Sequence, residues 1–345
     1  MKNKLLNLTI LTALAICIIL FLYRLAKTRE TTPNGFVRNF GSHHLQKIGE
    51  DISIEPIWRL VGLTDNKIYL GHQKYVQHIK EININDHSSC FSTIGGNIFQ
   101  STSLFRASLN IDSPFFFIND SFVSKFFKGN TRDFLARDYK MPKIKFDKAV
   151  SVKDGSLIVR LNDRKDGIVI GKAFAGTNRF IIDKTLLKAQ GDNYFSKDGI
   201  LLSDSESGKI VYVYLYRNDF LVIDSSLKRQ FEAKTIDTTS HSKIQLGYNG
   251  QNRLSMSAPA ARVNRYSWVW KSNLFIQSGL RADNEDIEDF NRGYTIDVYD
   301  LNQRGEYKYS LQLEGEEKNK LKGFRIRGNL LIALFDQKIK TYKII

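Results

Sequence analysis

The sequence predicts an all-β protein, a six-bladed β-propeller with four-stranded blades that follows one N-terminal transmembrane helix. Three observations lead to this fold class. An unbroken apolar run occupies residues 5–23. Beyond it, short apolar runs rich in Phe, Tyr, Ile and Val alternate with polar turns, and no long amphipathic helical pattern is found. These runs occur in pairs that recur along the chain, as expected of a repeat architecture.

The apolar run is the first element. Residues 1–4 form a short tail, and residues 5–23 contain Asn7, Thr9 and Thr12 as their clearly polar side chains. Because a helix needs about 20 mostly apolar residues to cross a bilayer, we expect an uncleaved transmembrane signal anchor. A lipoprotein signal at Cys17 and a cleaved signal peptide remain alternatives. The apolar residues continue beyond Cys17 to Tyr23, which favours the anchor.

Basic residues flank the run on both sides, and they predict its orientation only weakly. Lys2 and Lys4 precede the run, whereas Arg24, Lys27 and Arg29 follow it. Positive charge favours the cytoplasmic side, so the two ends compete. A four-residue tail is easily retained in the cytoplasm while a large domain is exported. We therefore expect a single-pass membrane protein whose domain lies on the extracytoplasmic (periplasmic) side.

A polar segment and then the repeats follow the anchor. Residues 24–35 contain Pro33 and Gly35 and predict a linker, which leaves residues 36–345 for the propeller. Six units pair two apolar runs across a turn: 58–73, 104–120, 149–163, 193–205, 266–279 and 323–336. The second runs begin near residues 67, 115, 156, 199, 273 and 329, so most intervals span 41–56 residues and one spans 74. A seventh unit near 236–261 lacks the paired pattern.

The last unit offers only three strands, the third at residues 338–344. A ring has to hide its strand edges. We therefore expect an N-terminal strand, from near residues 36–54, to close the last blade.

Two long connections should lie side by side on one face of the ring. The interval of 74 places about 30 extra residues near 236–265, and a second loop spans roughly 280–293. Strands of a blade alternate in direction, so both connections should emerge at the same end. Long loops on a rigid scaffold are a usual place for binding. The candidate binding residues are Arg262, Asn264, Arg265, Arg281, Asp283 and Glu285. Two interpretations stay open: a docking surface, or arginines that pair with the acids and hold the loops.

Three tryptophans fall in the predicted inner strands. Trp268 and Trp270 are two residues apart and therefore share a face, and Trp58 belongs to the first unit. Packing between blades is the first interpretation, and a stacking platform for a ligand is the second.

Composition and motifs argue against several functions. The net charge of +15 is spread over the chain without a long basic run or a nucleic-acid module, so we expect no nucleic-acid partner. The two cysteines and six histidines show no metal-ligand spacing, and no nucleophile-elbow or phosphate-loop motif occurs. We assign no catalytic residue, metal or cofactor.

Residues 257–290, 295–301 and 323–344 resemble an uncharacterised bacterial family of membrane-anchored, TolB-like six-bladed β-propellers. The resemblance is clearest in the last third of the chain. It implies the fold and its topology, and it brings no activity with it.

Together these features predict a membrane-tethered, extracytoplasmic binding or assembly module that presents its loop-rich face to a protein partner. Two alternatives stay open. One is a propeller enzyme, a hydrolase or lyase, acting at the central channel. The other is a sensor of a small ligand or glycan.

Overall fold

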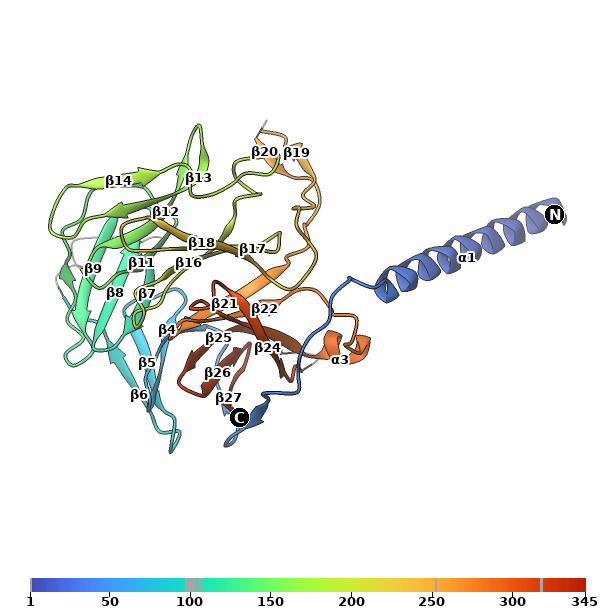
Figure 1. The fold of residues 1–345 in the computed structure, drawn as a ribbon. Coiled ribbons are helices and arrows are strands. Elements are labelled where there is room, and N and C mark those ends of the chain that lie inside the picture. Colours follow the sequence, from blue (N-terminus) through green and yellow to red (C-terminus); the bar gives the residue numbers. More distant parts are fainter. Residues whose placement is uncertain (1, 97–103, 105–106, 252, 317–318) are drawn as a thin grey trace.

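The computed structural model describes residues 2–345 apart from 97–103, 105–106, 252 and 317–318. Within the N-terminal helix it describes the side chains of residue 7 and of residues 10–24. Six antiparallel sheets stand around a central axis (Figure 1). The inner strands of neighbouring blades contact one another around this axis. The predicted six-bladed, all-β propeller with four-stranded blades is confirmed.

The blades follow one another in chain order, and each runs from its inner to its outer strand. Blade 1 has β3 (Trp58–Leu63), β4 (Lys67–His72), β5 (His78–Asn83) and β6 (Ser89–Thr93). Blade 2 has β7 (Ala107–Asp112), β8 (Phe115–Asp120), β9 (Lys125–Asn130) and β10 (Arg137–Asp138). Blade 3 has β11 (Lys148–Ser151), β12 (Leu157–Asp163), β13 (Gly167–Ala173) and β14 (Phe180–Asp183).

The remaining blades include the closing strands. Blade 4 has β15 (Gly199–Ser203), β16 (Ile210–Tyr214), β17 (Asp219–Ile223) and β18 (Arg229–Lys234). Blade 5 has β21 (Asn264–Trp270), β22 (Asn273–Ser278), β23 (Tyr294–Asp300) and β24 (Glu306–Leu313). Blade 6 has β25 (Leu321–Arg327), β26 (Leu330–Phe335) and β27 (Lys338–Ile344), completed by β1 (Leu45–Lys47) and β2 (Ile52–Ser53).

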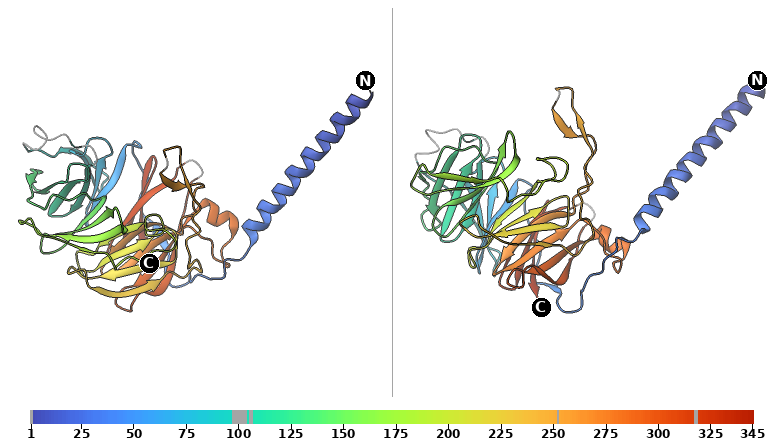
Figure 2. Two further views of the ribbon diagram at one scale, coloured as in Figure 1. Left: turned by 90° about the horizontal axis from the view of Figure 1, so that it is seen from above. Right: turned by 45° about the horizontal axis from the view of Figure 1, so that its top comes forward.

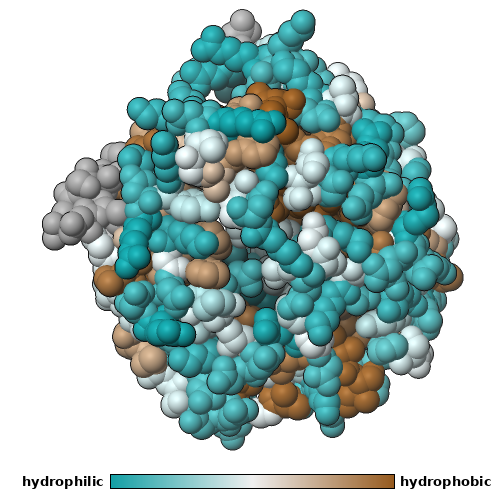
Figure 3. Space-filling view, turned by 60° about the vertical axis from the view of Figure 1, so that its left-hand side comes forward, coloured by the Kyte–Doolittle hydropathy of each residue, from teal (hydrophilic) through white to brown (hydrophobic). Residues whose placement is uncertain are grey.

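The core lies between the blades. All residues of β13 and β16 are buried, because the middle strands of a blade are covered on both faces by the neighbouring blades. This double burial explains why such strands read as unbroken apolar runs rather than as alternating patterns. Outside, hydrophilic side chains dominate the surface in Figure 3, and apolar ones form separate patches among them.

The expected closing strand is present. In β1, Leu45 lies opposite Ile344 of β27, and in β2, Ile52 lies opposite Ile339. Residue His44 exchanges two backbone hydrogen bonds with Ile345, of 3.0 and 3.1 Å. The segment at the start of the domain thus covers the outer edge of the last blade, as a closed ring requires.

Blade 4 departs from the predicted strand assignment. The run beginning at residue 199 is the inner strand β15, and the second strand of this blade, β16, begins at Ile210. Residues 193–198 are not a strand because Asp192 Oδ1 accepts the backbone N–H groups of Tyr194 and Phe195 and fixes a turn. The long interval of 74 was therefore measured from the wrong strand, although the insertion it predicted is present.

The apolar run 5–23 lies inside the helix α1 (Lys2–Thr31), which projects away from the ring (Figures 1 and 2). The helix continues into the predicted linker, 24–35, and ends two residues before Pro33. Over the described side chains, the structure contains no helix whose length and apolar character would carry it across a membrane.

We expect ring closure to depend on the backbone of β1. The hydrogen-bonded pair His44–Ile345 places Gln46 and Lys343 in the next hydrogen-bonded pair of the antiparallel ladder. Gln46→Pro removes the N–H of that pair and should lower the free energy of unfolding by about 1–3 kcal/mol. Urea denaturation of the full chain measures the change. The matched variant Gln46→Ala keeps the N–H and should unfold like the wild type; equal midpoints for both variants would contradict this role of β1.

Candidate functional site

Two insertions lie next to each other at one end of the ring. The first comprises residues 235–263, between β18 and β21, and carries the hairpin of β19 (Leu246–Tyr248) and β20 (Leu254–Met256). The second comprises residues 279–293, between β22 and β23, and carries α3 (Ile287–Arg292). The N–H of Gly279 donates to the Val263 carbonyl at 2.7 Å, which joins the two insertions as expected.

The hairpin β19–β20 is a two-stranded sheet that pairs with no blade, and it extends from the body of the ring (Figure 2). Its Tyr248 is 73% exposed. Polar residues around Gly250 allow the tight reversal, and the Asn249 side chain accepts the N–H of Gln251. Region 236–261 is therefore an appendage rather than a seventh blade.

Asp283 attaches the start of the domain to the second insertion. Its two carboxylate oxygens accept the backbone N–H groups of Asn34, at 2.6 Å, and Gly35, at 3.0 Å. The Asn34 side chain in turn donates to the Arg281 carbonyl at 2.8 Å. Arg281 itself donates to the carbonyl of Glu285 at 2.9 Å. Through these contacts Asp283 and Arg281 hold the start of the domain against the second insertion.

Glu285 belongs to a buried charge cluster with Arg38 and Asp297. The Arg38 guanidinium contacts Glu285 through Nη1 and donates to Asp297 from Nε at 2.7 Å. Thr295 and the Ala282 N–H each donate to Glu285 at 2.6 Å. Burial alone would lower the pKa of Arg38, but Asp297 and Glu285 raise that pKa above its ordinary value. The cluster connects the N-terminal segment to blade 5.

Asn264 is also structural. It is 1% exposed at the start of β21, and its side-chain amide donates to the carbonyls of Tyr214 and Arg217 at 2.8 and 3.1 Å. These bonds fix the entry of blade 5 against blade 4, so Asn264 is not available to a partner.

Arg262 and Arg265 differ from the other predicted residues. Both are exposed, and neither forms an ion pair with a described residue. They line a groove of about 610 Å³ between the two insertions, together with Tyr266 and Lys320. Gln277 lies at the groove and is 2% exposed, and its Oε1 has no hydrogen-bond partner among the described residues. Of the six predicted residues, these two arginines remain free to meet a ligand.

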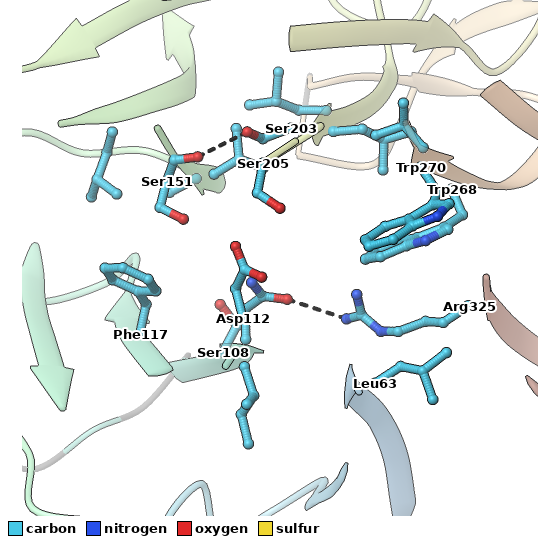
Figure 4. A pocket seen from close by; sticks show the side chains of 18 of the residues that line it. Leu63, Ser108, Asp112, Phe117, Ser151, Ser203, Ser205, Trp268, Trp270 and Arg325 are labelled. Carbon is cyan, nitrogen blue, oxygen red and sulfur yellow. Dashed lines mark hydrogen bonds between the residues drawn. The ribbon is translucent and has the colours of Figure 1, made fainter. Parts of the chain in front are cut away.

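A second cavity lies in the central channel, and sequence reasoning did not assign it. Its volume is about 240 Å³, and inner strands of all six blades line it. Trp268 and Trp270 line one side (Figure 4), whereas Trp58 is buried at the start of β3 and donates to Glu55. The sequence held a signal for this cavity. Trp268 and Trp270, and likewise Arg325 and Arg327, are two residues apart on adjacent inner strands and so share a face.

The guanidinium of Arg325 is fixed in one orientation in this cavity. Its guanidinium carbon lies 4.1 Å from the centre of the Trp268 ring, and Nη2 donates to Asn110 Oδ1 at 3.2 Å and to the Leu60 carbonyl at 3.4 Å. Arg327 stacks on Trp270 at 4.8 Å and pairs with the exposed Asp65. Cation–π stacking restricts each guanidinium to one plane.

Partial burial shifts the pKa values of two of the three charged groups that line the cavity, Arg325 and Asp112. Burial lowers the pKa of Arg325 to about 10, and the charge of Asp112 opposes this shift. Burial likewise raises the pKa of Asp112, against the effects of Ser205, Arg327 and Arg325. Arg325 thus lies in surroundings that solvate its charge poorly, whereas Asp112 keeps part of its surface in contact with solvent.

Comparisons with known proteins show the fold. No family model matches the chain, and no curated protein matches it. A solved structure of a DUF4221 family member from Bacteroides vulgatus is 15% identical, covers 91% of this chain and 99% of its own, and has a TM-score of 0.53. A catalytically inactive virginiamycin B lyase from Staphylococcus aureus, solved with quinupristin, is 11% identical over 88% of this chain and 100% of its own, with a TM-score of 0.49. A putative exported protein from Bacteroides fragilis is 11% identical over 90% and 96%, with a TM-score of 0.48. At these identities the likeness extends to the propeller fold alone, and the TolB-like resemblance stays a prediction.

We expect Arg38 to be essential for the stability of this face. Arg38→Met leaves Glu285 and Asp297 buried without their cation and should lower the free energy of unfolding by about 3–5 kcal/mol. Urea denaturation followed by tryptophan fluorescence measures the loss. The control Arg132→Met removes an exposed arginine of blade 2 and should change stability by about 0.5 kcal/mol or less. If both variants lose the same small amount, the cluster does not hold the N-terminal segment.

Proposed function

We propose that this protein is a membrane-tethered binding module on the extracytoplasmic side, and that its groove between the two insertions docks an acidic segment of a protein partner. The observation that carries the proposal is the division of charges at this face. Asp283 and Glu285 are engaged by the N-terminal segment, whereas Arg262 and Arg265 are exposed and have no carboxylate partner among the described residues.

The chemistry of the groove favours an acidic partner. A guanidinium binds a carboxylate through two parallel hydrogen bonds, so exposed arginines select acidic side chains. Lys320 adds a third positive charge to the lining. Residues 238–282 contain six Lys and Arg residues and no Asp or Glu. Such a field accelerates the encounter with an acidic surface.

The proposed tether is α1. In the run 5–23 apolar residues fall on every side of a helix, and described side chains such as Leu11 and Ile19 are 62% and 64% exposed. A helix that is apolar on all sides needs an apolar environment, and the run 5–23 has nearly the length of a membrane span. Asn34, which Asp283 holds, follows the end of α1 by three residues, so a membrane at α1 would lie close to the insertions.

The docking proposal predicts that charge reversal releases the partner. In native membranes, crosslinking and mass spectrometry of the co-purified proteins should identify one stoichiometric partner with an acidic segment. Arg262→Glu with Arg265→Glu should reduce its recovery about tenfold or more, because two attractive contacts become repulsive. Recovery should also fall when the salt concentration rises, since exposed charges are screened.

The matched control is Arg132→Glu with Arg137→Glu, which makes the same charge change on exposed residues of blade 2. This control should retain the partner. Equal recovery from the two double variants, or a folded wild-type protein that recovers no partner, would sink the docking proposal.

The tether predicts a separate result. Ile16→Arg with Ile19→Arg places two charges in the middle of the apolar run, at a cost of about 2.5–3.5 kcal/mol each for insertion. The protein should then move from the carbonate-resistant membrane fraction to the soluble fraction, whereas Ile16→Leu with Ile19→Leu should stay in the membrane. A charged variant that remains resistant to carbonate would show that α1 is not the anchor.

A further inference from the structure

Three charged residues line the central cavity: Arg327, which pairs with Asp65, and Arg325 and Asp112, which form no ion pair with each other. Arg325 projects from β25 and Asp112 from the end of β7 (Figure 4). No carboxylate of a described residue lies within 4.0 Å of the Arg325 guanidinium. Arg325 lies in enclosed surroundings, where an unpaired charge is costly, whereas Asp112 is exposed at the edge of the cavity. Both side chains line the same cavity of about 240 Å³, which offers the space for a ligand.

Arg325 is prepared to receive an anion. Its hydrogen bonds to Asn110 and Leu60 both come from Nη2, so Nε and Nη1 have no partner among the described residues. The Trp268 ring, 4.1 Å from the guanidinium carbon, fixes the plane of the fork. A fork held in this way loses little freedom when it binds a carboxylate through two bonds.

Asp112 and the hydroxyl groups around it suit a positively charged group. Ser205 interacts with the Asp112 carboxylate, and Ser151 and Ser203 line the same side of the cavity. Carboxylate oxygens and neighbouring hydroxyl oxygens can together accept the three N–H groups of an ammonium group. The cavity therefore offers an anion receptor and an ammonium receptor within one enclosure.

From this arrangement we propose that the channel is a binding site for a free α-amino acid, whose carboxylate meets Arg325 and whose ammonium group meets Asp112. A zwitterion matches both charges, whereas a simple anion or cation would leave one of them unmatched. The volume of about 240 Å³ lies below the usual range for drug-sized ligands, which suits a molecule as small as an amino acid. The walls near Trp270, Leu63 and Phe117 would take the side chain of the amino acid.

The site would open away from the insertions. Inner strands begin at the insertion end of the ring, as β21 does directly after residue 263, and Asp112 lies at the far end of its inner strand. Asp112 is also exposed, so that end of the cavity is accessible to solvent. The amino-acid site is thus separate from the basic groove, and its existence does not depend on the docking proposal.

The test is isothermal titration of the full chain, in detergent, with each of the twenty α-amino acids. At least one should bind with a dissociation constant below the millimolar range. Its N-acetyl derivative, which lacks the ammonium group, and its carboxamide, which lacks the carboxylate, should each bind about 10- to 100-fold more weakly. These ligand-side controls use the unaltered protein and do not depend on how any variant folds.

Two variants assign the contacts. Arg325→Met and Asp112→Asn should each weaken binding about 10- to 100-fold, while Arg132→Glu with Arg137→Glu, on exposed residues of blade 2, should leave it unchanged. Circular dichroism verifies that the variants fold, and Arg325→Lys replaces Arg325→Met if the latter does not. The proposal is overturned if none of the twenty amino acids binds, if the derivatives bind as well as the parent amino acid, or if a folded Arg325 variant keeps full affinity.

Discussion

Closure of the ring is the constraint on which the rest of the structure depends. Every blade buries its faces against its neighbours, so an open end would expose both a face and a strand edge to water. Pairing of β1 and β2 with β27 removes that open end. The same N-terminal segment then holds the second insertion, because Arg38 lies between Glu285 and Asp297. One short stretch of chain therefore completes the last blade and orders the face beside blade 5.

Strand direction divides the molecule into two ends with different chemistry. At the insertion end, Arg262 and Arg265 are exposed to solvent, where charges act mainly over long range. In the channel, Arg325 carries the same functional group in an enclosed setting, and there geometry decides what can bind. Exposure therefore sets how an arginine can act, and the rigid ring keeps these two settings apart in one chain.

The sequence predicted the six blades, the closing strand and both insertions, because apolar runs and polar turns reflect burial directly. It misplaced the second strand of blade 4, since local capping by Asp192 turned a strand-like run into a turn. The roles of Asp283 and Glu285 could not be predicted, because their partners Asn34 and Arg38 lie almost 250 residues away. The cavity likewise arises only when β21 and β25 become neighbours and bring Trp268 beneath Arg325.

Ring closure also has a consequence in time. Leu45 and its partner Ile344 are 299 positions apart in the chain. A ribosome adds ~5–20 residues per second, so the closing segment has to wait roughly 15–60 s for its partner to be made. Blades 1–5 can stack during synthesis, but the ring itself can be sealed only afterwards. Until then the nascent chain has an unpaired strand and a blade with one uncovered face. In this state it is most prone to aggregation and most in need of a chaperone.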